Sequence, residues 1–208
     1  MSAVAGYEAA LRSGVGTLVD GQGRHRSLPV PLWLAEASET DLALLARCGG
    51  PTLDVGCGPG RMTAALTTTG RPALGIDISA LAVRMTVARG GLALRRNVFH
   101  PIPGLGAWST VLLADGNIGI GGDPVALLRR CAALLAPTGS VVLDVEPPGA
   151  GLVVEKLRIE QPGSAGGWFR WCWLGVDALA AVAAAAGLSV KQVWAGGSRW
   201  HATLAVPR

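Results

Sequence analysis

The residue types with the clearest chemical meaning lie in one short stretch, Asp54 to Gly60. Its sequence, DVGCGPG, places three glycines in alternate positions directly after an apolar run that contains a carboxylate. Glycines let a backbone turn sharply and approach a ligand closely. A helix is expected just after Gly60, and the first turn of a helix presents unpaired N–H groups. The stretch therefore predicts a ligand-binding loop at the carboxyl edge of an α/β sheet.

The neighbours of these glycines decide which ligand the loop suits. A dinucleotide fingerprint G-x-G-x-x-G needs a further glycine at position 61 or 63, where the chain has Arg61 and Thr63. Pro59 has no N–H to offer a pyrophosphate. The carboxylate of Asp54 would repel a pyrophosphate and attract an ammonium group. The loop therefore favours a nucleoside that carries an amino acid.

Residues 53–60 resemble motif I of the class I S-adenosylmethionine-dependent methyltransferases almost residue for residue, and the resemblance covers roughly residues 50–146. It includes the strand that ends at Asp77, whose carboxylate would accept both ribose hydroxyls, and residues 97–99, which match the adenine-contacting step. Many relatives have an aspartate where Asn97 stands, but an amide oxygen can also accept a hydrogen bond from adenine. The resemblance implies S-adenosylmethionine as cofactor, held by Asp54, Gly56, Cys57, Gly58, Gly60, Asp77, Ile78, Asn97, Val98 and Ala114.

The resemblance also implies methyl transfer by in-line displacement, which needs alignment and exclusion of water more than a fixed catalytic group. A base is needed only if the acceptor must lose a proton. The candidate catalytic residue is Asp115, in the loop expected beside the methionine end of the cofactor. It could orient an acceptor or act as a base, or it could merely cap a turn. The sequence ADGN at 114–117 lacks the Asn/Asp-Pro-Pro-aromatic motif of some amine-methylating relatives, which argues against methylation of nucleic-acid bases at exocyclic amines.

Three tryptophans, at positions 168, 171 and 173, are expected to face one side of a strand. Packing on the core is the default explanation for such a stripe. A sharper hypothesis is that they wall a pocket for a flat or apolar small molecule. The candidate substrate-pocket residues are therefore Asn117, Trp168 and Trp171. No metal ligand is assigned, because neither the three histidines nor the four cysteines have partners at metal-ligand spacing.

The elements that must position these residues follow from the hydrophobic pattern. Apolar runs alternate with helix-like segments, which is typical of a parallel α/β sheet. Strands are predicted at residues 51–55, 73–77, 91–94, 110–114, 140–145, 188–194 and 200–206. Together with the resemblance, this pattern predicts a Rossmann-like sheet of seven mostly parallel strands, with helices on both faces and the last strand antiparallel.

A length of 208 residues suits a single domain. Within it we expect an N-terminal helical cap over residues 1–48 and a cofactor-binding core over 49–146. Residues 147–174 are expected to form a hairpin lid across the mouth of the sheet, and 175–208 to supply the C-terminal helix and strands.

The composition is that of a globular chain, with 50% hydrophobic and 15% charged residues. No unbroken apolar run reaches the about 18 residues of a membrane span, and no signal-peptide pattern is present, so we expect a cytoplasmic protein without a membrane partner. Almost all of the basic residues behind the net charge of +4 are arginines, which are scattered along the chain and include the pairs 24/26, 95/96 and 129/130. Their scatter argues against nucleic acid as a partner, and the Arg, Ala and Gly bias indicates a GC-rich bacterial genome.

These features favour methyl transfer to a small-molecule acceptor. RNA methylation, suggested by the sequence pI of 9.2, is one alternative. A non-catalytic protein that binds S-adenosylmethionine is another, because a cofactor loop alone does not prove turnover. The sequence determines neither the acceptor atom nor the oligomeric state.

Overall fold

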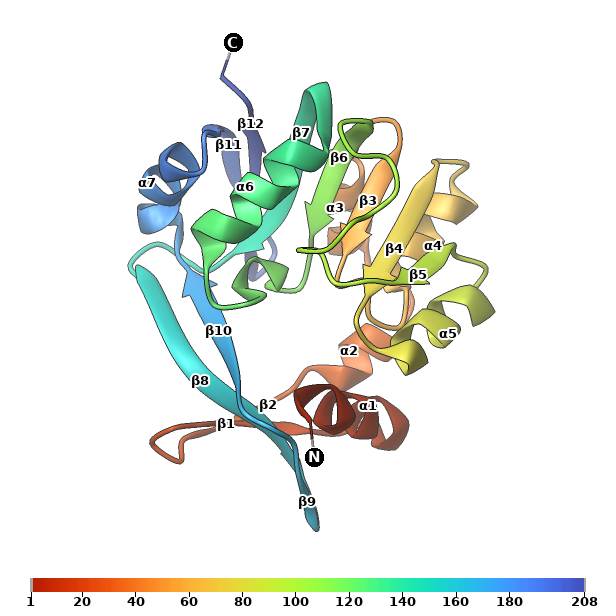
Figure 1. The fold of residues 1–208 in the computed structure, drawn as a ribbon, viewed down its shortest axis with the longest axis vertical. Helices are drawn as coiled ribbons and strands as arrows, with labels where there is room; N and C mark the ends of the chain where they lie inside the picture. Colours follow the sequence, from red (N-terminus) through yellow and green to blue (C-terminus); the bar gives the residue numbers. More distant parts are fainter. Residues whose placement is uncertain (1, 208) are drawn as a thin grey trace.

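The apolar runs of the sequence form one large sheet in the computed structural model, which describes residues 2–207. Its strands are β3 (Thr52–Val55), β4 (Ala73–Asp77), β5 (Ala93–Arg95), β6 (Trp108–Leu113), β7 (Leu135–Val145), β11 (Ser189–Gly196) and β12 (Arg199–Ala205). They lie in the order β11-β12-β7-β6-β3-β4-β5 (Figure 1). From β7 to β5 all neighbours are parallel, whereas β12 is antiparallel to both of its neighbours. The predicted Rossmann-like sheet, with its last strand antiparallel, is confirmed.

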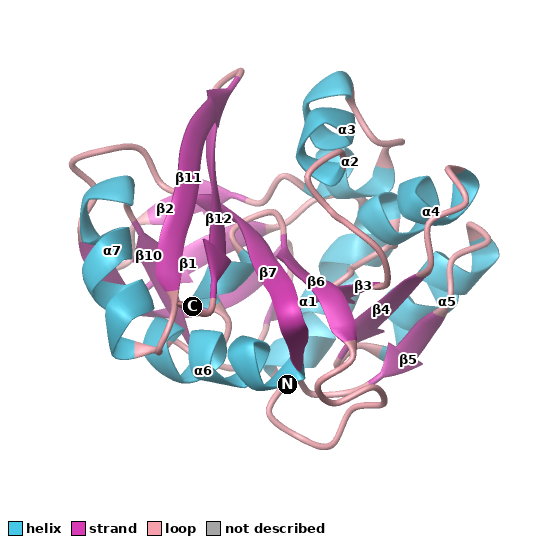
Figure 2. Cartoon of the chain, turned by 90° about the horizontal axis from the view of Figure 1, so that it is seen from above, coloured by secondary structure: helices cyan, strands magenta, loops and turns pink. Residues whose placement is uncertain are grey.

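Helices cover both faces of this sheet (Figure 2). They are α3 (Glu39–Leu45), α4 (Arg61–Thr68) and α5 (Ala80–Ala88) on one side, and α6 (Pro124–Leu134) and α7 (Val176–Ala185) on the other. Side-chain caps set where several of them begin: Ser38 and Asp41 form a capping box at α3, and Ser79 and Asp123 cap α5 and α6. Within residues 2–207, no helix has both the length and the hydropathy needed to cross a membrane.

The central strands are continuous apolar runs because they are buried on both faces. Leu53, Val111 and Leu143 pack with side chains of α6 and α7. Leu112 and Val142 pack with α3 and α4 on the opposite face. All five of these side chains are fully buried. This two-sided core fixes the carboxyl ends of the strands, from which the predicted ligand-binding loops emerge.

A second, antiparallel sheet lies below the carboxyl ends of the main strands in the view of Figure 1. It contains β1 (Thr17–Asp20), β2 (His25–Ser27), β8 (Leu152–Gln161), β9 (Ser164–Ala165) and β10 (Phe169–Leu174). The strand order is β10-β8-β1-β2, and β9 pairs with β8. The expected pairing of the two flanks of segment 147–174 is present as β8 and β10.

The N-terminal segment 1–48, expected to be helical, also contributes the two strands β1 and β2. Thr17 of β1 pairs with Glu160 of β8, which lies far along the chain. No local pattern signals such a long-range pairing, which explains why the sequence did not predict these strands.

The N-terminal helix α1 (Ala3–Ser13) connects the two sheets. Ser2 caps its first turn, and Gly14 ends it in the left-handed conformation. The helix packs between α5 and β8, together with the short helix α2 (Val30–Leu34). The contacts around α1 form a third group of buried apolar side chains, beside those on the two faces of the main sheet. Its members are Ala10, Leu11, Leu28, Val30, Ala82 and Ile159.

Candidate functional site

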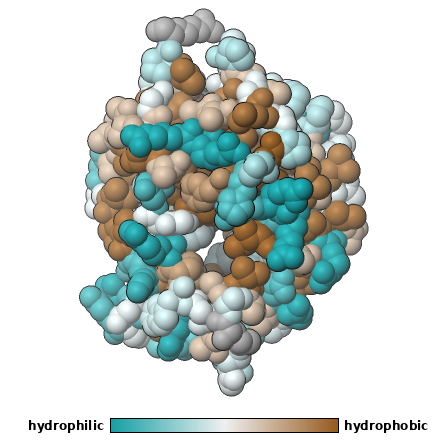
Figure 3. Space-filling view, in the orientation of Figure 1, coloured by the Kyte–Doolittle hydropathy of each residue, from teal (hydrophilic) through white to brown (hydrophobic). Residues whose placement is uncertain are grey.

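A cavity of about 570 Å³ lies between the carboxyl ends of the main strands and the second sheet. The ends of β3, β4 and β6 form one wall, and α1, β1, β8 and β10 form the other. Figure 3 shows this face of the molecule hollowed, with hydrophobic side chains around the opening. Ligands of open α/β sheets bind at this edge. Of the predicted site residues, all but Gly60 and Trp168 line the cavity.

The glycine loop connects β3 to α4 and depends on its glycines. Gly56, Gly58 and Gly60 have φ angles of 73°, 55° and 90°, which few other residues adopt. A Cβ on Gly56 would lie 2.8 Å from Nδ2 of Asn117, and one on Gly60 would lie 2.7 Å from the backbone of Thr86. Gly60 therefore acts on the shape of the loop without lining the cavity itself.

The N–H groups of this loop are used within the protein. Those of Gly56 and Cys57 donate to the carbonyl of Ile76, 2.8 and 3.0 Å away. The N–H of Gly58 donates to Oδ2 of Asp77, and that of Gly60 donates to the carbonyl of Cys57. Pro59, between them, has no N–H. The loop therefore has no free donor for a pyrophosphate, which agrees with the rejection of a dinucleotide.

Asp54, at the end of β3, is only 1% exposed. Its Oδ2 accepts a hydrogen bond of 2.7 Å from the hydroxyl of Thr63. Burial raises the pKa of Asp54 to about 7, although the hydrogen bond from Thr63 acts to lower it. Within residues 2–207, no basic side chain forms an ion pair with this carboxylate. The site therefore fits a ligand that brings its own cation, such as an ammonium group.

Asp77, at the end of β4, holds the next part of the cavity wall. Its two oxygens accept hydrogen bonds from the N–H groups of Gly58, at 3.1 Å, and Ser79, at 2.8 Å. Burial raises the pKa of Asp77, and the backbone hydrogen bonds oppose that rise. Each carboxylate oxygen has a further lone pair, so Asp77 can also accept hydrogen bonds from ligand hydroxyls. Ile78, the next residue, is half-exposed and borders the cavity.

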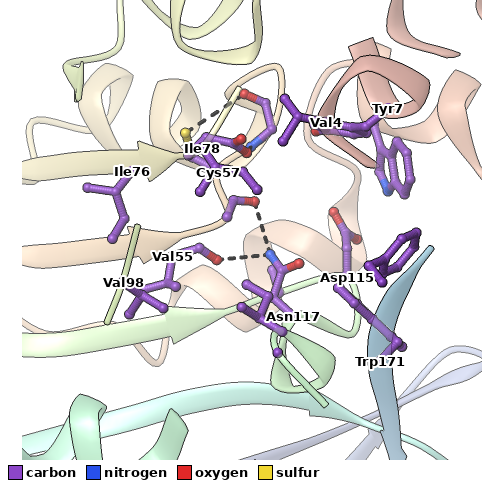
Figure 4. A pocket seen from close by; sticks show the side chains of 18 of the residues that line it. Val4, Tyr7, Val55, Cys57, Ile76, Ile78, Val98, Asp115, Asn117 and Trp171 are labelled. Atoms are coloured by element: carbon purple, nitrogen blue, oxygen red, sulfur yellow. Dashed lines mark hydrogen bonds between the residues drawn. The ribbon is translucent and has the colours of Figure 1, made fainter. Parts of the chain in front are cut away.

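The two ends of the cavity differ in chemistry. Figure 4 places Ile76 and Val98 toward one end, and Tyr7, Asp115 and Trp171 toward the other. The first end is apolar and contains Asn97, whose Oδ1 accepts a hydrogen bond of 3.0 Å from the N–H of Phe99. That bond is typical of an asparagine that shapes a turn, and it leaves the oxygen one more lone pair. An apolar slot joined to buried carboxylates fits an adenosine that carries an amino acid.

Cys57 and Ala114 are small residues that border the cavity. The thiol of Cys57 lies 3.6 Å from the hydroxyl of Thr86, and burial raises its pKa. A Cβ on Gly75 would come within 2.7 Å of the sulfur, so the absence of a side chain at Gly75 makes room for the thiol. Cys57 is therefore a protonated packing residue rather than a reactive thiol.

Asp115, just after β6, is the one non-glycine residue with a positive φ, 54°, within the described range 2–207. Both of its carboxylate oxygens lie 2.6 Å from Nη2 of Arg61. Its N–H donates to Oδ2 of Asp144, 2.8 Å away. These contacts hold a conformation that is otherwise unfavourable for a non-glycine residue. Burial raises the pKa of Asp115, while the charge of Arg61 opposes the rise.

Arg61 and Asp115 belong to a larger cluster of buried charges. Arg61 also forms an ion pair with Asp41 of α3. Arg199 of β12 pairs with Asp41 and lies 3.5 Å from both Asp115 and Asp144. Burial disfavours ionisation of Asp41, but the hydrogen bonds that Asp41 accepts, led by that from Arg61, lower its pKa to about 2. This cluster joins α3, α4, β7 and β12 beneath the end of the cavity that contains Asp115.

The predicted substrate-pocket residues separate into two groups. The Nδ2 of Asn117 donates to the carbonyls of Val55 and Gly56, at 2.9 and 3.0 Å (Figure 4), so it ties its loop to the glycine loop. Trp171 lines the cavity and packs edge-on against Phe169. Trp168 does not line the cavity: it is 46% exposed and lies under the guanidinium of Arg158.

The expectation that Trp168 shares a face with Trp171 and Trp173 is therefore corrected. Side chains along an extended strand alternate between faces, and Trp168 is three residues from Trp171. It also precedes the first residue of β10, Phe169. Trp173, two residues beyond Trp171, does line the cavity.

Several residues of the site were not expected from the sequence. In the sequence, Arg61 was only an argument against a dinucleotide ligand. A positive charge at the start of a helix is unfavourable unless it is paired, so the position of Arg61 could have predicted an acidic partner. Tyr7 and Trp33, whose rings lie edge to face in the cavity wall, give no such signal. The Nδ1 of His201 lies 2.6 Å from Oδ1 of Asp144. The sequence gives no signal for this contact either, because β12 and β7 meet only in the folded sheet.

Comparison with known proteins adds to this geometry. Residues 53–143 match the family model described as a methyltransferase domain. These residues include the glycine loop, Asp77 and Asp115. No curated protein matches the chain.

Solved structures resemble the whole fold. An S-adenosylmethionine-dependent methyltransferase from Bacteroides fragilis, in complex with S-adenosylhomocysteine, is 24% identical with a TM-score of 0.81, over 99% of this chain and 94% of that one. The 1,6-didemethyltoxoflavin N1-methyltransferase of Burkholderia thailandensis is 16% identical with a TM-score of 0.67, over 99% and 87%. A sugar N-methyltransferase of Streptoalloteichus is 18% identical with a TM-score of 0.59, over 85% and 88%. At these identities the likeness concerns the fold.

The match assigns a methyltransferase domain to residues 53–143. Over its whole length the chain has the fold of a solved S-adenosylmethionine-dependent methyltransferase. Domain and fold together support an S-adenosylmethionine-dependent methyltransferase, with S-adenosylmethionine as cofactor.

Proposed function

We propose that the enzyme methylates a small, largely apolar molecule that binds against the second sheet. The observation that carries the proposal is the wall opposite the glycine loop. It is made of large apolar and aromatic side chains, namely Leu18, Trp33, Leu157, Ile159, Phe169, Trp171 and Trp173. Such a wall suits the faces of a flat or apolar acceptor. The cavity of about 570 Å³ must also hold the cofactor, so the space that remains suits a small molecule.

The same wall argues against RNA as the acceptor. The second sheet stands across the mouth of the main sheet, where a polynucleotide would have to enter (Figure 1). Arg61, which borders the cavity, is paired with Asp41 and Asp115 and so is not free for a phosphate. Among the structures with this fold, two are named for methylation of a toxoflavin precursor and of a sugar, which is support at the level of fold only.

The proposal gives each predicted cofactor residue a role. S-adenosylmethionine, when bound, supplies a methyl group already activated on a sulfonium. Asp54 would hold its ammonium group, and Asp77 its ribose hydroxyls. Ile78, Asn97 and Val98 would border the adenine. Gly56 and Gly58 would allow the close approach, with Cys57, Gly60 and Ala114 shaping the walls around it.

Asp115 would orient the acceptor rather than take its proton. Its carboxylate already binds Arg61 at 2.6 Å, and a proton on Asp115 would weaken that buried ion pair. Asn117 and Trp171 would form the nearby pocket wall. Residues 147–174, with β1 and β2, would act as the lid that keeps water from the reacting groups.

A methyl-transfer assay tests this proposal. The purified enzyme is incubated with methyl-labelled cofactor and with separate small-molecule and RNA fractions of a bacterial extract. Label is expected in a small molecule, which mass spectrometry then identifies. Label that enters RNA alone would overturn the proposal.

The Trp171→Ala variant tests the place of binding with the acceptor so identified. We expect KM for the acceptor to rise about tenfold or more, since a buried aromatic contact is lost, while affinity for S-adenosylhomocysteine stays within about twofold. An unchanged KM for the acceptor would indicate that the acceptor does not bind against the second sheet.

A further inference from the structure

The amino-acid end of the cofactor carries a carboxylate as well as an ammonium group, and the glycine loop has no donor for it. Every N–H from Gly56 to Gly60 already has a partner in the protein. The side-chain amide of Asn117 is also used, by the carbonyls of Val55 and Gly56. A carboxylate that enters this region therefore needs a donor from another element.

Tyr7 of α1 places a hydroxyl at this end of the cavity (Figure 4). A Cβ built on Gly58 would lie 3.1 Å from that hydroxyl, so the oxygen is next to the glycine loop. Within residues 2–207, the Tyr7 hydroxyl has no hydrogen-bond partner. It is thus a partly buried polar group that borders the cavity with its hydrogen-bonding capacity unused, and so it is available to a ligand.

The position of Tyr7 is fixed by its neighbours rather than by the hydroxyl. The adjacent Glu8 accepts hydrogen bonds from the hydroxyl of Ser79, at 2.8 Å, and from the N–H of Leu81, at 3.2 Å, at the start of α5. One residue earlier, Gly6 packs so closely on Gly166 that a Cβ would lie 3.0 Å from its Cα. The ring of Tyr7 meets that of Trp33 edge to face. The hydroxyl is therefore held in place before any ligand binds, which lowers the entropic cost of a hydrogen bond to it.

The charges around Tyr7 make it a donor. Burial raises its pKa well above the ordinary value, and the carboxylates of Asp77 and Asp115 add to the rise. The phenol is therefore protonated at neutral pH and can donate a hydrogen bond. Those same carboxylates repel a second anion, so a ligand carboxylate at this end needs at least one hydrogen bond to offset the repulsion.

We propose that the hydroxyl of Tyr7 donates a hydrogen bond to the carboxylate of the amino-acid part of S-adenosylmethionine. With Asp54 opposite the ammonium group, the site then recognises both charges of the amino acid. Helix α1 becomes part of the cofactor site, and the enzyme gains a preference for the complete cofactor over nucleosides that lack the amino acid.

The test compares two ligands that differ only in this part. S-Adenosylhomocysteine carries the amino acid, and 5′-methylthioadenosine has a methyl group in its place. Calorimetry of the wild type and of Tyr7→Phe measures both affinities. We expect Tyr7→Phe to weaken S-adenosylhomocysteine about tenfold and to change 5′-methylthioadenosine by less than about twofold, because a charge-assisted hydrogen bond is lost from one ligand only.

Two results would overturn the proposal. Equal losses of affinity for both ligands would indicate that Tyr7 binds the ribose. No loss of affinity for either ligand would indicate that the first turn of α4 binds the carboxylate instead. The matched control is Trp33→Phe, which changes the other ring of the same aromatic pair and should affect the two ligands equally. Thermal unfolding of each variant confirms that the fold is kept. The experiment uses no acceptor, so its outcome is independent of the proposed small-molecule substrate.

Discussion

The two walls of the cavity are built in different ways. The cofactor wall is made by the main chain: positive-φ glycines and backbone hydrogen bonds shape a loop between Asp54 and Asp77. The opposite wall is made by side chains from β1, α2, β8 and β10 that meet only in the folded protein. A wall made by the main chain keeps its shape when side chains vary, whereas a wall made by side chains changes its ligand with each substitution. The difference explains how one fold can hold a single cofactor and serve many acceptors.

The walls differ also in how their charges are held. The pair Arg61–Asp41 beneath the cofactor wall has side chains that are 3% and 0% exposed. In the second sheet, Arg26, which is 42% exposed, pairs with Glu155 at 2.7 Å, and Glu155 has a second partner in Arg24 at 3.1 Å. A buried charge that loses its partner is costly. Removal of Arg61 leaves two carboxylates with less compensation, whereas removal of the partly exposed Arg26 leaves Glu155 still paired with Arg24. Substitution of each arginine should therefore reveal the contrast.

The largest effect is expected for Arg61→Met. Removal of the guanidinium leaves Asp41 and Asp115 with Arg199 as their one basic partner among residues 2–207. We expect the free energy of unfolding to fall by about 3–5 kcal/mol, measured by urea denaturation. The matched variant Arg26→Met, in the second sheet, should cost less than about 1 kcal/mol. Similar losses for the two variants would remove the distinction between buried and exposed pairs.

The second prediction compares the two walls by cofactor affinity. Asp77→Ala removes the carboxylate proposed for the ribose, and binding of S-adenosylhomocysteine should weaken by about 10- to 100-fold. Trp171→Ala, on the opposite wall, should leave that affinity within about twofold. Calorimetry of both variants gives the comparison, with thermal unfolding as the control for the fold. An Asp77→Ala variant with wild-type affinity would contradict the assignment of the ribose.

The same division governs what the sequence could predict. The strands of the main sheet were placed to within a few residues, because each is a local apolar run followed by a turn or a helix cap. The glycine loop was identified because its chemistry lies in consecutive residues. The strands β1 and β2 were missed, since Thr17 meets its partner Glu160 only through long-range pairing.

In the site, single residues show where local reasoning ends. Asp54 was found because it directly precedes the glycine loop, and Asp77 because the resemblance to the methyltransferase family includes the strand that it ends. Tyr7 was missed because its position next to Gly58 depends on how α1 packs on α5. Trp168 was misplaced because sequence spacing alone did not give the first residue of β10.

The third prediction uses the buried carboxylate of the cofactor wall. Burial raises the pKa of Asp54 to about 7, above its ordinary value, so in the free enzyme Asp54 is largely protonated below pH 7. A bound ammonium group favours the ionised form. Affinity for S-adenosylhomocysteine should therefore rise about five- to tenfold from pH 6 to pH 7.5, as the binding-competent ionised fraction increases.

Calorimetry in buffers of different ionisation enthalpy measures this effect directly. Binding at pH 6 should release a proton from Asp54, and the release should vanish near pH 8. The Asp54→Asn variant should bind more weakly and lose the dependence on pH over this range. A dependence that persists in Asp54→Asn would assign the titration to another group.

The smallest effect is expected for substitution of Trp168. Its comparison with Trp171 distinguishes the outer surface of the second sheet from the side that lines the cavity. Trp168 is 46% exposed, and the guanidinium of Arg158 lies 4.9 Å from the centre of its ring. Trp168→Ala should therefore lower the free energy of unfolding by about 1 kcal/mol or less and leave the acceptor KM unchanged. Trp171→Ala, three residues along the same chain segment, should raise that KM about tenfold or more. If Trp168→Ala raised KM as much as Trp171→Ala did, specificity would belong to the whole segment rather than to the cavity face of β10.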